Sequence, residues 1–83
     1  MYELKHLEYF AKTGDLLEIT LAKLNDDWIL MFSTSSIEGF SLHTARGQQR
    51  KFKSLDAVGA VAKELRDLAY YEGHDLAVTV DWI

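Results

Sequence analysis

Hydrophobic and polar residues alternate with a period of two in three segments of the chain, which is the pattern of half-buried strands. In residues 16–24 the predicted apolar face is made by Leu17, Ile19 and Leu21. Residues 40–45 and residues 76–82 alternate in the same way. Glycine, asparagine and aspartate fall between these segments and mark the turns, because the chain contains no proline.

One segment is apolar at consecutive positions. Residues Trp28 to Phe32 read WILMF, so both faces of a strand would be hydrophobic there. This pattern predicts a central strand that is covered on each side. A helix can supply one cover. We expect a partner subunit to supply the other, in a homodimer formed through the sheet face around Trp28 to Phe32.

The N-terminal segment, residues 2–12, fits two structures. As a helix it would place Leu4, Leu7 and Ala11 along one stripe. As a strand it would pair with residues 16–24 through a hairpin closed by Gly14 and Asp15. The strand is the favoured interpretation, because Gly14 and Asp15 would then close this hairpin.

Residues 54–71 form the clearest helix. Ser54 is a good N-cap, since its hydroxyl can accept a hydrogen bond from a free amide of the first turn. Asp56 lies where the helix dipole favours negative charge, and Gly73 is a suitable stop. The predicted apolar stripe consists of Leu55, Val58, Val61, Ala62, Leu65, Leu68 and Ala69. We attribute Gly59, inside the helix, to a close approach of the helix to the sheet.

The segments together predict an α+β domain. It has an antiparallel β-meander of four or five strands, one amphipathic helix at about 54–71 packed on one face, and a final strand at about 76–82. Residues 48–53 form a return strand after a turn at Arg46 and Gly47, and this strand buries mainly Phe52. A chain of 83 residues makes one domain, 1–83, with no room for a second core.

Composition narrows the function classes. Without cysteine there are no disulfides, thiolate metal sites or cysteine nucleophiles. The N-terminus does not read as a secretory signal, and no window has the ~20 apolar residues of a membrane helix. We therefore expect a cytoplasmic protein that makes no membrane contact. A net charge of −4 argues against a general nucleic-acid coat, because such binding scales with the phosphates that a basic surface neutralises.

Residue types that carry catalysis are present but badly spaced. The three histidines, His6, His43 and His74, lack a second ligand at the close spacings of metal sites. The hydroxyls of residues 32–36 have no nucleophile elbow around them, and the glycines are scattered. We predict no catalytic residue, no metal and no cofactor, and hence a protein that is not an enzyme.

The most unusual local feature is a basic stretch in an acidic chain. It contains Arg46, Arg50, Lys51 and Lys53. Arginine makes bidentate contacts with phosphate or carboxylate, so a binding patch that contacts DNA is one interpretation. The other is that the charges guard an exposed edge strand against aggregation.

Residues 42–47, LHTARG, are followed by Arg50 and by residues 52–57, FKSLDA. This pattern resembles small plasmid-borne accessory proteins of the ParC-type, partition-associated class, over the stretch Leu42 to Leu65. The resemblance implies a non-enzymatic bacterial role in the maintenance of a plasmid or another mobile element. It supplies no catalytic residues.

The expected function is therefore a small bacterial binding module that acts through protein–protein contact. One alternative is a nucleic-acid-binding accessory protein that uses the basic hairpin 46–53. Another is an inhibitor or antitoxin-like protein that blocks a host machine, such as a defence complex.

Overall fold

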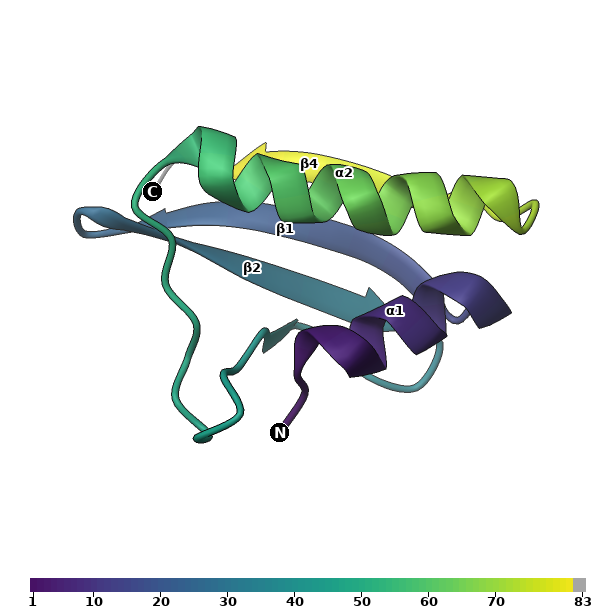
Figure 1. Ribbon diagram of the computed structural model, residues 1–83, viewed down its shortest axis with the longest axis horizontal. Coiled ribbons are helices and arrows are strands. Elements are labelled where there is room, and N and C mark those ends of the chain that lie inside the picture. Colours follow the sequence, from purple (N-terminus) through teal and green to yellow (C-terminus); the bar gives the residue numbers. More distant parts are fainter. Residues whose placement is uncertain (82–83) are drawn as a thin grey trace.

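The chain folds into two layers, a four-stranded sheet and two helices that lie over one of its faces (Figure 1). The computed structural model describes residues 1–81, so residue 82 of the predicted last strand lies outside the described part. In chain order the elements are α1 (Leu4–Thr13), β1 (Leu16–Leu24), β2 (Asp27–Thr34), β3 (Phe40–Ser41), α2 (Leu55–Tyr71) and β4 (Ala77–Asp81).

The sheet is mixed, with the strand order β3-β2-β1-β4. β1 and β2 form an antiparallel hairpin that turns at Asn25, whose φ of 59° is left-handed. β4 pairs with β1 in parallel. The α+β class is confirmed, but the purely antiparallel meander is wrong. Parallel neighbours need a crossover connection, and α2 lies within that connection.

The N-terminal segment is the helix α1, so the favoured strand is wrong. Leu7 and Ala11, four residues apart, are completely buried on the stripe that the helix alternative predicted. The backbone N–H of Glu3 donates to His6 Nδ1 over 2.9 Å at the start of the helix. Gly14 adopts a φ of 80° and ends α1 instead of closing a hairpin.

β1 contains an irregularity that alternation alone did not predict. The register with β2 shifts between Leu16 and Glu18. Leu16 is therefore buried, whereas Leu17, which we placed on the apolar face, is 50% exposed. A bulge inserts one residue and reverses the faces on one side of it.

The two predicted strands around the basic stretch are mostly absent. Only Phe40 and Ser41 of the segment 40–45 form β3. The return strand 48–53 is reduced to single bridges, one joining Trp28 to Phe52 and one joining His43 to Gln49. Phe52 is buried as expected. Its flanking residues are polar or charged, so nothing else in the segment gains by packing on the core.

The core lies between the sheet and the helices. Phe32 is its largest fully buried side chain, and the ring of Tyr2 packs edge-on against it at 5.4 Å between centroids. The interior side chains of β1 and β2 meet Leu7 of α1 and Val58 and Leu65 of α2 there.

Helix α2 is confirmed. The Ser54 hydroxyl accepts a hydrogen bond from the Ala57 backbone N–H at 3.1 Å, as an N-cap does. Val58, Ala62, Leu65 and Ala69 are buried along the predicted stripe.

The opposite face of the sheet carries no helix among residues 1–81. Ala22 and Ile29 lie opposite one another on it, and both are already buried, at 3% and 6% exposure. Trp28, Leu30 and Phe32 belong instead to the core under the helices. Only alternate residues of β2 reach the second face, so the apolar run 28–32 is divided between the two faces. The homodimer through the second face stays a prediction.

Gly14 gives a test of the packing between α1 and the loop after α2. A Cβ at position 14 would lie 2.7 Å from His74 Cε1, whereas at Gly73, with an equally positive φ of 83°, it would meet nothing within 4 Å. Both alanine variants should lose about 1–2 kcal/mol through the left-handed backbone. Gly14→Ala should lose about 1 kcal/mol more, because the collision adds to that strain. Urea denaturation measures both losses, and equal values would show that the His74 ring moves aside without penalty.

Candidate binding surface

The four basic residues of the predicted site lie in different surroundings. The Arg50 guanidinium stands 4.9 Å above the centre of the Phe52 ring. Lys53 Nζ lies 3.5 Å from the Asp27 carboxylate, although the lysine side chain is 95% exposed. Arg46 and Lys51 are exposed and form no ion pair with another described residue. The structure thus brings the four into one segment but not into one pocket.

This basic segment runs beside the part of the outer side of β2 that β3 does not cover. Trp28 and Phe52 exchange two backbone hydrogen bonds, each 2.8 Å long, so residue 52 covers part of that edge. Lys51 and Lys53 flank the buried Phe52 and are exposed. Charged residues on an irregular segment are typical of a protected sheet edge.

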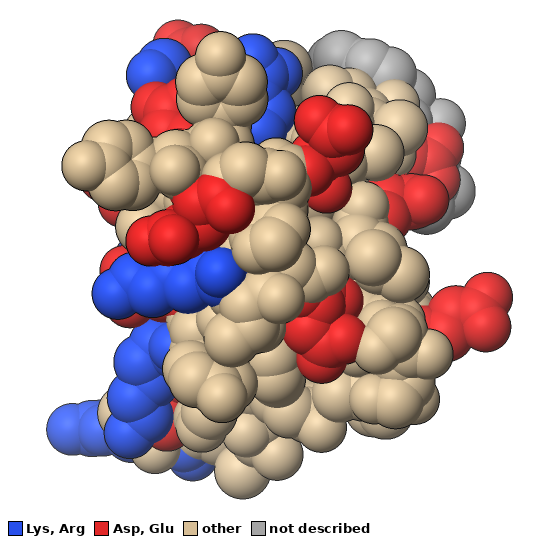
Figure 2. Space-filling view, turned by 90° about the vertical axis from the view of Figure 1, so that its right-hand side faces the viewer, with Lys and Arg blue, Asp and Glu red and all other residues tan. Residues whose placement is uncertain are grey.

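Figure 2 views the molecule from the end where α2 stops and β4 starts. Basic side chains keep to the left margin and the top of this face, and acidic side chains are scattered over an otherwise uncharged surface. A continuous basic area, which phosphate binding would use, is not present on this face.

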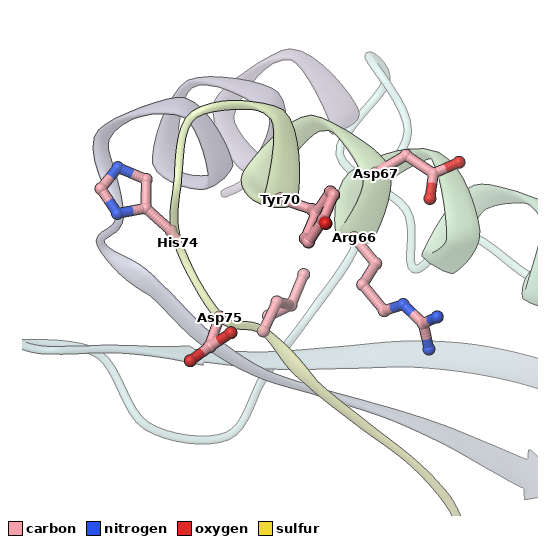
Figure 3. Close-up of a pocket in the computed structure, with 6 residues that line it drawn as sticks. Arg66, Asp67, Tyr70, His74 and Asp75 are labelled. Carbon is pink, nitrogen blue, oxygen red and sulfur yellow. The ribbon is translucent and has the colours of Figure 1, made fainter.

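An open hollow of about 390 Å³ lies at the C-terminal end of α2 (Figure 3). It is lined by Arg66, Asp67, Tyr70, His74, Asp75 and Leu76. Figure 3 shows the His74 ring directed away from Arg66, and it lies instead against Gly14. His74 therefore has a packing role, and it does not form an acid–base pair with the other polar groups of the hollow.

A smaller groove of about 300 Å³ lies between α2 and β4. Its floor and walls are small or apolar side chains, and two basic residues form its rim. The residues are Leu21, Gly59, Ala62, Lys63, Arg66 and Val78. Lys63 Nζ is held by the Asp67 carboxylate at 2.7 Å. Arg66 forms no ion pair with any residue of the described chain.

The strand beside this groove is an unprotected edge. β4 pairs with β1 alone among the described residues, so its other side has no strand partner there. Residues 77–80 are Ala, Val, Thr and Val, without lysine, arginine or proline. Val80 is 45% exposed. Natural proteins usually guard such an edge with charges, as the basic segment does beside β2.

Gly59 belongs to this groove and not to a tight helix–sheet contact. A Cβ built on it meets nothing within 4 Å, so the close approach expected from the sequence is wrong. Glycine inside a helix costs about 1 kcal/mol relative to alanine. The fold of residues 1–81 gives no steric reason for this cost, and the glycine leaves the wall of the groove open.

Sequence reasoning missed this groove and this edge. The available signals were the uncharged run 77–80 and the unexplained glycine at 59, in a helix that is otherwise well formed. Neither signal indicates an edge until the strand order is known.

Comparison with known proteins found no matching family model, no matching curated protein and no matching solved structure. Nowhere in residues 1–81 do three side chains of the metal-binding types gather to hold an ion. None of the helices described is both long enough and apolar enough to cross a membrane.

The open wall at Gly59 predicts a stabilising substitution. Gly59→Ala should raise the free energy of unfolding by about 0.5–1 kcal/mol, because alanine restricts the unfolded chain and nothing opposes its methyl group. Ala60→Gly, one position along the same helix, is the matched control and should lower it by a similar amount. Thermal denaturation compares the two, and a destabilised Gly59→Ala variant would contradict the open groove.

Proposed function

We propose that this chain is a non-enzymatic binding module that acts through protein–protein contact. The single observation that carries the proposal is the edge of β4, which is uncharged over residues 77–80, partly apolar and without a strand partner in the described chain. A free edge is a template for pairing with another polypeptide.

The surroundings of β4 support the same function. The groove beside it offers apolar contact, and Val80 adds a half-exposed aliphatic side chain. Tyr70 and Tyr71, at the end of α2, are 79% and 86% exposed. Exposed tyrosines are enriched at protein interfaces, because one side chain provides both apolar area and a hydroxyl.

The biological setting of this function rests on the resemblance of Leu42 to Leu65 to ParC-type partition-associated proteins. On that basis the module belongs to a plasmid or another mobile element of a bacterium. Its partner is then either part of a maintenance system or a host machine that the module inhibits. Both roles use the same kind of contact.

The test is capture of a partner followed by measurement with purified components. The tagged chain is used as bait in its native host, and each captured protein is then purified and titrated by calorimetry. We expect one protein to bind at a fixed stoichiometry with a dissociation constant of about micromolar or below. Binding that depends only on a nucleic acid, or a captured set in which no purified protein binds, would refute the proposal.

A second candidate function is nucleic-acid binding by the hairpin 46–53. It is favoured by one observation, the exposure of Arg46 and Lys51 without an ion pair to a described residue. A gel-shift with duplex DNA should then show affinity that falls steeply with salt concentration. Arg50→Ala combined with Lys51→Ala should weaken it, whereas Lys63→Ala, a charge removed from α2, should not. No shift at low salt would exclude this candidate.

A further inference from the structure

We infer that the edge of β4 takes up an extended segment of a protein partner as an additional strand, and that an acidic residue of this segment contacts Arg66. The inference rests on the proposed function and deepens it, because it names the binding mode and the chemistry of the partner. Three observations select this occupant.

The backbone of β4 selects a strand. In a parallel pair, alternate residues direct their N–H and C=O groups toward the neighbour, and the remaining residues direct them away. β4 is bonded to β1 on one side only within the described chain. Alternate residues of 77–81 therefore present a donor and an acceptor outward. An extended backbone satisfies both at the strand spacing, which a helix does not.

The groove selects apolar side chains on alternate positions of that strand. In an added strand, every second side chain faces the helix layer. On β4 the residues of this face are Val78 and Val80, because they pair with Ile19 and Leu21 of the core. The open wall at Gly59 leaves room beside them for an aliphatic side chain of the partner.

Arg66 selects a carboxylate. It lines both the groove beside β4 and the hollow at the end of α2, so a strand added along β4 would run near it. Figure 3 shows its side chain on the side of the hollow away from His74. Lys63, the other cation of the rim, already has Asp67 as a partner. An acidic residue on the helix-facing side of the incoming strand would supply Arg66 with the counter-charge that the described chain does not.

A second copy of this chain fits the edge less well. In antiparallel pairing, opposed residues share a face of the sheet. The acidic residue of β4, Asp81, pairs with Ala22 on the face away from the helices. A second β4 would therefore turn only Val78 and Val80 toward α2, and would bring no carboxylate to Arg66. The observations favour a different chain as the occupant.

The probe is a synthetic peptide, Thr-Val-Thr-Glu-Thr-Val-Thr with blocked ends, which places valine, glutamate and valine on one face of a strand. It is titrated to a few millimolar into the isotope-labelled chain by NMR, a range that detects a dissociation constant of about 1 mM or tighter. The largest shifts should fall on the amides of 77–81 and on the Arg66 side chain. A peptide with lysine in place of glutamate should bind about two- to fivefold more weakly.

Two pairs of variants locate the contact. Gly59→Leu fills the groove and should weaken binding about tenfold or more, while helix propensity keeps the fold stable. Ala60→Leu, on the adjacent exposed position of α2, should bind like the unchanged chain. Arg66→Gln should remove the preference for glutamate over lysine in the peptide. Arg46→Gln, which removes the same charge from the distant turn, should retain it.

Each outcome decides a separate point. Absence of shifts at 77–81, or shifts that Gly59→Leu leaves unchanged, would overturn the inference. Suppose that the free chain dimerises, that Gly59→Leu abolishes the dimer and that the peptide does not bind. The occupant of the edge would then be a second copy of this chain, which would also overturn the inference. If a purified native partner binds Gly59→Leu and Ala60→Leu equally, the protein-binding function stands and only the β4 mode fails. If no protein partner is captured, the proposed function fails, and the peptide titration separately decides whether β4 accepts an added strand.

Discussion

The parallel pairing of β4 with β1 is the constraint on which the rest of this structure depends. Parallel strands cannot be joined by a tight turn, so the chain must leave the sheet and return over one face. Helix α2 lies within that return and forms most of the cover of the core. Because the pairing places β4 outermost, it also creates the edge and the groove beside it. The core and the proposed binding surface thus share one origin.

The two edges of the sheet differ in chemistry. Beside β2, the chain adds the bridge of Phe52 and flanks it with the exposed Lys51 and Lys53. Beside β4, the described chain adds no covering strand, residues 77–80 carry no lysine or arginine, and α2 keeps a glycine where alanine would stabilise the helix. Because of this difference, we propose that Lys51 and Lys53 mainly protect the edge beside β2 and that the edge of β4 is used for binding.

Local signals were sufficient for some elements and not for others. Helix α2 was predictable because its signals are local: Ser54 caps its start and the apolar stripe lies within it. Residues 2–12 fit both a helix and a strand, and only the burial of Leu7 and Ala11 against other elements decides between them. The direction of β4 depends on the whole topology, so the groove could not be predicted. The basic residues could be identified in the sequence as charges. That Arg50 lies over the Phe52 ring and Lys53 beside Asp27, and that these side chains share no pocket, could be seen only in the structure.

The central claim, an open β4 edge, is tested most directly by amide hydrogen exchange in the free chain. The account predicts that protection alternates along residues 77–81, because alternate amides donate to β1 and the others face outward. The N–H groups of β1, which lies inside the sheet between β2 and β4, should be protected without such alternation. Uniform protection of all five β4 amides would contradict the account, since it would mean that the edge is already covered.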